Sequence, residues 1–130
     1  MGGRGAYDPR GGFTKQDYHH NRRVGRIKVV EKINGGSGLP QYSNTRNTRY
    51  WGVDKNGNIN QLRIFRNRQA VIDIDFPHSN AKGVAAKIHA HLWVNGERQD
   101  EHRKLSVASE KRYKKLLDLA IRDNKARSGK

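Results

Sequence analysis

The chain has 130 residues, no cysteine, and 27 Lys and Arg against 12 Asp and Glu, which gives a formal net charge of +15. A chain this short is expected to form one small domain, which excludes an enzyme with separate cofactor and substrate domains. The lack of cysteine excludes disulfides, thiolate metal sites and cysteine nucleophiles, and it fits a reducing compartment. The first residues lack the apolar region of a secretory signal, and no apolar run approaches the ~20 residues of a membrane span, so we expect no membrane association.

The excess of Lys and Arg favours a polyanionic partner. Each Lys or Arg that neutralises a phosphate releases condensed counterions, so we expect nucleic acid as the partner, with RNA ahead of DNA. The largest share of the excess falls in residues 24–95, which indicates a basic folded surface and not only basic tails. The alternative is that the charge serves solubility alone.

Composition divides the chain into one domain and two tails. Residues 1–17 are rich in Gly at their start, and residues 124–130 are polar and basic, so both segments are expected to be flexible. Residues 18–123 are expected to form a single domain.

Residues 18–34 fit two kinds of secondary structure. Val24, Ile27, Val30 and Ile33 recur at intervals of three, which favours a helix, whereas the run Ile-Lys-Val-Val is also typical of a strand. We predict a helix over this segment.

Four antiparallel strands are predicted after the glycine-rich break that follows. The first three cover residues 49–53, 59–66 and 69–76, and Asn-Gly at positions 56 and 57 marks the turn between the first two. The fourth covers residues 87–94, where apolar and polar side chains alternate.

The end of the domain is predicted to be helical. Ser106 is a candidate N-cap, and an apolar stripe runs along residues 107–123. The sequence therefore predicts the α+β class: about four antiparallel strands, with an N-terminal and a C-terminal helix on one face.

Strand alternation gives the predicted sheet a second face that is polar, basic and aromatic, as in sheets that bind RNA. The residues of this face are His89, His91, Trp93, Asp73, Asp75 and Arg63. Because helices are expected to cover only the apolar face, we expect this one to be open to a substrate that contacts Asp73, Asp75 and Trp93.

This composition predicts cleavage of RNA without a metal. RNA carries its own nucleophile, the 2′-hydroxyl, so the protein needs only a base, an acid and a cation. We predict that His89 or His91 is the general base, and that His78 or the other histidine is the acid. A guanidinium, from Arg63 or Arg46, would stabilise the charge on the phosphate.

A polar loop before the first of these strands is a further candidate for substrate binding. Ser43 and Thr45 offer hydroxyl groups, and Arg46 and Arg49 offer guanidinium groups. Together they could hold a phosphate or the edge of a base.

Two other interpretations of the histidines stay open. His89 and His91 could be purely structural, or the His-x-His and Asp-x-Asp pairs could hold a metal ion. The positive surroundings oppose a cation, so we expect neither a metal nor a cofactor. His102, in a charged turn, is expected to be solvated.

Several short motifs together resemble a small module of phage minor head proteins and bacterial polymorphic toxins. They are residues 38–45 (GLPQYSNT), 54–57 (DKNG), 73–76 (DIDF) with His78, 88–93 (IHAHLW) and the Asn-Gly pair at 95–96. The resemblance covers roughly residues 36–98. The Pro-His-x-His-x-Trp run that is common in the family is replaced here by Lys-Ile-His-Ala-His-Leu-Trp, and the C-terminal helix lies outside the pattern.

The resemblance implies a metal-independent ribonuclease of the barnase–EndoU–colicin–RelE (BECR) type, in which a helix precedes a four-stranded antiparallel sheet. The site positions it implies are Ser43, Thr45, Asp73, Asp75, His78, His89 and His91. It also implies a place in the cytoplasm of a host bacterium or in the virion, with an immunity protein or a host protein as partner. The alternative is a non-catalytic phage protein that binds nucleic acid or inhibits a host nucleic-acid enzyme.

Overall fold

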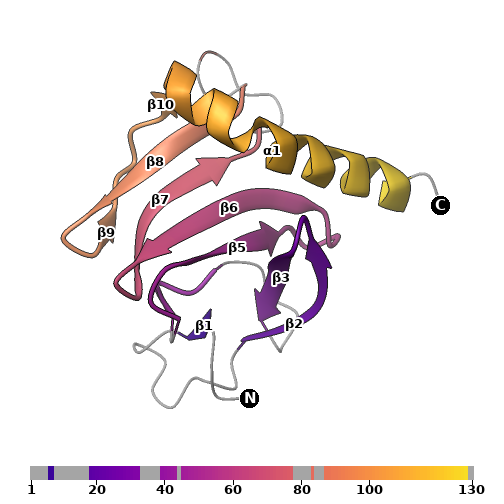
Figure 1. Cartoon of the computed structure of the whole chain (residues 1–130), viewed down its shortest axis with the longest axis horizontal. Helices are drawn as coiled ribbons and strands as arrows, with labels where there is room; N and C mark the ends of the chain where they lie inside the picture. Colours follow the sequence, from indigo (N-terminus) through magenta and orange to yellow (C-terminus); the bar gives the residue numbers. More distant parts are fainter. Residues whose placement is uncertain are drawn as a thin grey trace.

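The computed structural model describes residues 6–7, 18–32, 39–43, 45–77, 83 and 87–128. They form one mostly antiparallel, curved sheet with a long helix lying across it (Figure 1). The α+β class is therefore confirmed, but the described sheet has ten strands where about four were predicted. Within these residues, no helix combines the length and the apolar character needed to cross a lipid bilayer.

The strands vary from two to eight residues in length. They are β1 (Ala6–Tyr7), β2 (Tyr18–Val24), β3 (Ile27–Lys32), β4 (Tyr42–Ser43), β5 (Thr48–Val53), β6 (Ile59–Arg66), β7 (Gln69–Asp75), β8 (His89–Val94), β9 (Glu97–Arg98) and β10 (Arg103–Lys104), and the helix is α1 (Val107–Ser128). Their order is β1-β4-β7-β6-β5-β3-β2, with β8 on β7 and both β9 and β10 on β8. Of the described pairs, β3 with β5 is parallel and the others are antiparallel.

The helix predicted for residues 18–34 is wrong, because the described part of this segment is the β2–β3 hairpin. Gly25 and Arg26 form its turn with φ angles of 57° and 67°, the positive values of the tight turns that match strand twist. Val24 and Ile27 are direct partners across this turn, so their spacing of three comes from a hairpin and not from a helical stripe. Ile33 lies outside the described residues.

The strands predicted between residues 49 and 94 are confirmed. The observed β5, β6, β7 and β8 agree with the predicted bounds to within two residues. The connections also follow the sequence signals, since Asn67 and Arg68 have positive φ, as do Asn95 and Gly96. Glycine or asparagine at these places tolerates the left-handed backbone that tight hairpins require.

The C-terminal helix begins as predicted and ends later than predicted. The Ser109 amide donates to Ser106 Oγ at 3.1 Å, which confirms Ser106 as the N-cap. The helix continues to Ser128, so residues 124–128 are helical and not a flexible tail. The Asn124 amide group also exchanges two hydrogen bonds of 2.8 Å with the backbone of Ile59, which fastens this end of the helix to β6.

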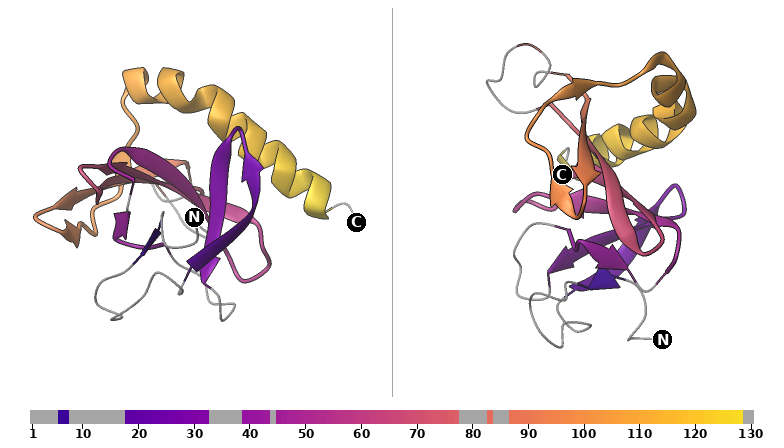
Figure 2. Two further views of the ribbon diagram at one scale, coloured as in Figure 1. Left: turned by 60° about the horizontal axis from the view of Figure 1, so that its bottom comes forward. Right: turned by 90° about the vertical axis from the view of Figure 1, so that its left-hand side faces the viewer.

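Helix α1 covers one face of the sheet, as both views in Figure 2 show. The core beneath it contains the apolar side chains of β2, β3, β5, β6 and β7 together with Leu117 and Ala120 of the helix. Trp51 is fully buried at its centre, and its indole nitrogen donates to the Val24 carbonyl at 2.9 Å. This face matches the apolar side of the predicted alternation.

The second face of the sheet is also covered, contrary to the expectation that it would be open. Its apolar part is a second core cluster of Val30, Leu39, Tyr50, Phe65 and Ala70. Leu39 comes from the segment before β4, and the polar residues of the face are buried beside this cluster.

Gly52 is the position that lets Leu39 approach the sheet. A Cβ atom at residue 52 would lie 2.9 Å from both Cγ and Cδ1 of Leu39, which is closer than side-chain atoms pack. A side chain on this residue would therefore push Leu39, and with it the segment that covers the polar face, away from the sheet.

We predict that Gly52→Ala lowers the free energy of unfolding by about 1–3 kcal/mol, the usual effect of overpacking a core. Urea denaturation measures this loss. The control is the double variant Gly52→Ala/Leu39→Ala, in which the clash is absent, so its loss should be at least ~0.5 kcal/mol smaller than the sum of the single losses. Additive losses would show that Leu39 does not restrict this position.

Candidate functional site

Strand pairing brings the predicted polar residues into two rows on the second face of the sheet. The first row contains Tyr50, Arg63, Asp73 and His91, and the second contains Gly52, Gln61, Asp75 and His89. Each row crosses β5, β6, β7 and β8. Side chains directly opposite each other on neighbouring strands are close enough to interact, so the register itself assembles the site.

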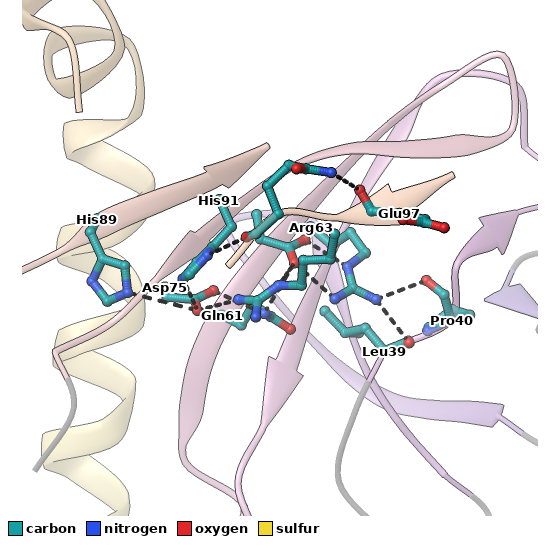
Figure 3. A network of polar contacts seen from close by, with 11 residues as sticks. Leu39, Pro40, Gln61, Arg63, Asp75, His89, His91 and Glu97 are labelled. Carbon is teal, nitrogen blue, oxygen red and sulfur yellow. Dashed lines mark hydrogen bonds and ion pairs between the residues drawn. The ribbon is translucent and has the colours of Figure 1, made fainter. Parts of the chain in front are cut away.

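Two guanidinium groups and two carboxylates form the centre of this site (Figure 3). Arg63 pairs with Asp73 through two bonds, Nε to Oδ1 at 2.6 Å and Nη2 to Oδ2 at 2.9 Å. Arg98 of β9 binds both carboxylates, donating to Asp73 at 2.7 Å and to Asp75 at 2.5 Å. Gln61 donates to Asp75 at 2.9 Å. The two positive and two negative charges balance, which is what permits Asp73 to be fully buried.

The remaining donors of Arg63 bind the segment of Leu39 and Pro40 that covers the polar face. Its Nη1 donates to the carbonyl of Leu39 at 2.9 Å and to that of Pro40 at 3.2 Å. Its guanidinium carbon also lies 4.8 Å from the centre of the Trp93 ring, in a cation–π contact. Arg63 therefore contacts Asp73, the covering segment of Leu39 and Pro40, and Trp93.

The pKa of Arg98 is raised by its partners. Partial burial acts against the charge of this guanidinium, but its hydrogen bond to Asp73 and the negative charges of Asp75 and Asp73 outweigh that cost. Arg98 therefore stays charged, and it keeps both carboxylates neutralised from the more exposed side of the network.

The rings of His89 and His91 are fixed by backbone carbonyls. Nδ1 of His89 lies 2.8 Å from the Lys87 oxygen, and Nδ1 of His91 lies 2.9 Å from the Gln99 oxygen. A carbonyl oxygen only accepts, so each Nδ1 carries the hydrogen and donates it. The Nε2 atoms then point toward Asp75, whose Oδ2 lies 3.9 Å from His89 and 3.4 Å from His91 (Figure 3).

A third imidazole, from His102, completes a cluster with these two. The centre of its ring lies 4.8 Å from that of His89 and 4.7 Å from that of His91. The ring of His102 is exposed, as the sequence predicts, but it packs against two buried rings and is not simply solvated. In the described part of the chain, this trio is the group of His, Asp and Glu side chains whose ligand atoms are close enough to hold a metal ion.

The other predicted site residues lie elsewhere, and His78 lies outside the described residues. Ser43 is fully buried, where its Oγ shares a 2.7 Å hydrogen bond with the Tyr50 hydroxyl and accepts one from the Thr45 amide. Burial raises the pKa of Tyr50, and the hydrogen bonds of its hydroxyl to the side chains of Ser43 and Thr45 only partly offset this. Ser43 and Tyr50 are thus buried polar partners, whereas Thr45 is exposed and lines the basic groove described below.

Arg46 and Arg49 are not brought to the histidines. Arg49 pairs with Ile64 and so faces the helix side of the sheet, opposite to Arg63. Arg46 is exposed, and its Nε donates to Asn67 at the turn between β6 and β7.

Arg49 belongs instead to a basic groove with a cavity volume of about 640 Å³. The groove is lined by the β2–β3 turn, the starts of β3 and β5, the end of β6 and the first half of α1. Its cationic side chains are Arg23, Arg26, Lys28, Arg49, Arg66 and Arg112, and Tyr113 adds an aromatic ring. Among the residues that the structure describes, no carboxylate lines the groove and none of the six cations forms an ion pair.

The sequence prediction missed Arg98, Gln61 and His102 of the polar site, and it missed most of the groove. The signal for Arg98 was present, because the Asn-Gly turn at 95–96 folds β9 back and pairs Arg98 with Trp93. Gln61 stands two residues from Arg63 on the same strand, so alternation could have found it. No local signal brings together the groove cations, which come from both ends of the chain.

No protein-family model matches this chain, and searches of curated proteins and of solved structures find no significant match. The likeness to the phage and toxin module, and the location and partners that it implies, therefore stay predictions.

We predict that Asp73→Asn lowers the free energy of unfolding by about 3–5 kcal/mol, because it leaves Arg63 and Arg98 without one of the charges that compensates their burial. Chemical denaturation of both proteins measures the change. The matched control is Glu101→Gln, which removes an exposed pair with Arg103 and should cost at most about 1 kcal/mol. Equal losses in the two variants would contradict a structural role for the buried network.

Proposed function

We propose that the protein binds single-stranded RNA through the basic groove. The observation that carries this proposal is the gathering of six cationic side chains around one concavity, with no carboxylate among the described residues of its lining. Such a groove attracts the phosphates of a nucleic acid, because each phosphate that pairs with a cation releases a condensed counterion.

The shape and lining of the groove support a single strand. Tyr113 is half-buried in the lining and offers a ring on which an unpaired base can stack. The cations come from three directions, namely the β2–β3 turn, the sheet and the helix, so they can follow a bent backbone. Charge that served solubility alone would not need to converge on one hollow.

We predict that the variants Arg26→Gln, Arg49→Gln and Arg112→Gln each weaken binding to single-stranded RNA. Each should also reduce the slope of log K against log salt by about 0.7, the value for one lost contact to a single strand. Fluorescence anisotropy with a labelled RNA at several salt concentrations measures both quantities.

Lys55→Gln is the matched control, because it removes one exposed charge outside the groove. If it weakens binding as much as the groove variants do, the interaction is one of net charge and the groove is not the site. Tighter binding to single-stranded DNA of the same sequence would overturn the choice of RNA.

Cleavage of RNA at the histidine cluster is a second candidate function. The observation that favours it is the contact of the exposed ring of His102 with the buried rings of His89 and His91 beside Asp75. In the reaction, one imidazole takes the proton of the 2′-hydroxyl while the 2′-oxygen attacks phosphorus. A second imidazole gives a proton to the leaving 5′-oxygen, which leaves a 2′,3′-cyclic phosphate and a 5′-hydroxyl end.

His89 is fully buried and His91 is 2% exposed, so the exposed His102 is the imidazole of the cluster that a phosphodiester meets first. We therefore predict that His102→Ala lowers the rate of RNA cleavage in EDTA by about 10²- to 10⁴-fold, the usual effect of losing a general acid or base. Glu101→Gln should cleave like the wild type. The absence of cyclic-phosphate product from the purified wild type would reject the cleavage hypothesis and leave RNA binding unaffected.

A further inference from the structure

We propose that His89, His91 and His102 form a binding site for Zn²⁺. Each residue places one ligand atom within 4.8 Å of those of the other two. Imidazole nitrogen is a preferred donor for Zn²⁺, and three histidines leave one position of a tetrahedral ion open to water. The site takes no part in the RNA groove, so the inference does not depend on RNA binding.

Two of the three ligands are already oriented for a metal ion. Nδ1 of His89 and Nδ1 of His91 donate to backbone carbonyls, so in the neutral rings the lone pair is on Nε2. Histidines that ligate metals have this arrangement, in which an outer hydrogen bond to a carbonyl or a carboxylate fixes the tautomer and the ring plane. Nε2 of His91 is buried and makes no hydrogen bond with the described residues.

His102, the third ligand, is the residue that can move to bring the three nitrogens to metal-binding distance. Metal–nitrogen bonds of about 2.0–2.1 Å in a tetrahedral site place the nitrogens about 3.3 Å apart, so the cluster has to close by up to about 1.5 Å. His102 is exposed and lies between β9 and β10, outside both strands, whereas the other two rings are on β8. The exposed side of His102 also gives an ion a path to the buried rings.

The local charge accepts a cation despite the basic character of the whole chain. The charges of Arg63 and Arg98 are matched by those of Asp73 and Asp75, and the Asp75 carboxylate lies 3.4 Å from His91 Nε2. The donors are nitrogens, which suit Zn²⁺ and its transition-metal neighbours better than Mg²⁺ or Ca²⁺.

A bound ion and metal-independent cleavage would use the same ring nitrogens, so the metal test is carried out without RNA. The chain has six histidines, and the variant His19→Ala/His20→Ala/His78→Ala retains only the three of the cluster. This variant is titrated with Zn²⁺ by calorimetry, and its nitrogen-15-labelled imidazoles are followed by NMR. Circular dichroism confirms that it keeps the fold of the wild type.

We expect one Zn²⁺ ion per chain, with Nδ1 protonated and Nε2 bound to the metal in His89 and His91. Co²⁺, used as a spectroscopic probe, should give visible bands of tetrahedral intensity, and Mg²⁺ should not bind. His102→Ala should weaken Zn²⁺ binding by more than the roughly 10- to 100-fold effect of a lost outer-shell partner. Arg103→Ala, a change at the exposed neighbouring residue, should not weaken it.

Three results would overturn the site. They are the absence of Zn²⁺ binding to the three-histidine variant, binding that leaves the ring nitrogens of His89 and His91 unshifted, and equal affinities of the His102→Ala and Arg103→Ala proteins. If His102→Ala does not fold, the NMR titration of the three-histidine variant decides alone. Neither a failed nor a successful metal titration changes the RNA-binding result, since that is read from the groove variants.

Discussion

The paired charges of Arg63 and Asp73 are the constraint on which the second face of the sheet depends. A carboxylate with no exposed surface is tolerated only when a cation and hydrogen bonds replace the water it has lost, and here two arginines do so. The bidentate geometry fixes β6 against β7, and Arg98 brings β9 into the same arrangement. A slip of one of these strands by one residue would send its members of the network to the opposite face.

The sheet carries two cores that differ in kind. Under α1 the contacts are apolar, and they tolerate exchange of one hydrophobic side chain for another of similar volume. On the other face an apolar cluster borders an ionic network, in which the arginine donors bond to particular carboxylate and carbonyl oxygens. The first core supplies burial of apolar surface, and the second restricts how the strands can align. The six cations of the groove take no part in either core.

Local patterns in the sequence identified much of this architecture. Period-two alternation and asparagine–glycine turns fixed the central strands, and with them the shared face of His91, Asp73 and Arg63. They could not reveal the β2–β3 hairpin, since a spacing of three at a tight turn imitates a helical period. They also could not show that the polar face is covered, because Leu39 reaches it from a segment with no regular pattern. The place of His102 in the cluster depends on how β10 returns to β8, which no single segment encodes.

The parallel pairing of β3 with β5 has a consequence for access to the polar face. Two parallel neighbours cannot be joined by a tight turn, so the chain between them has to cross from one end of the sheet to the other. Leu39 and Pro40 lie on that crossing, and Tyr42, two residues later, is already paired with β7. The segment that closes the site is therefore tied into the sheet on either side. Displacement of Leu39 and Pro40 from the polar face would therefore disturb the pairing of β4 with β7.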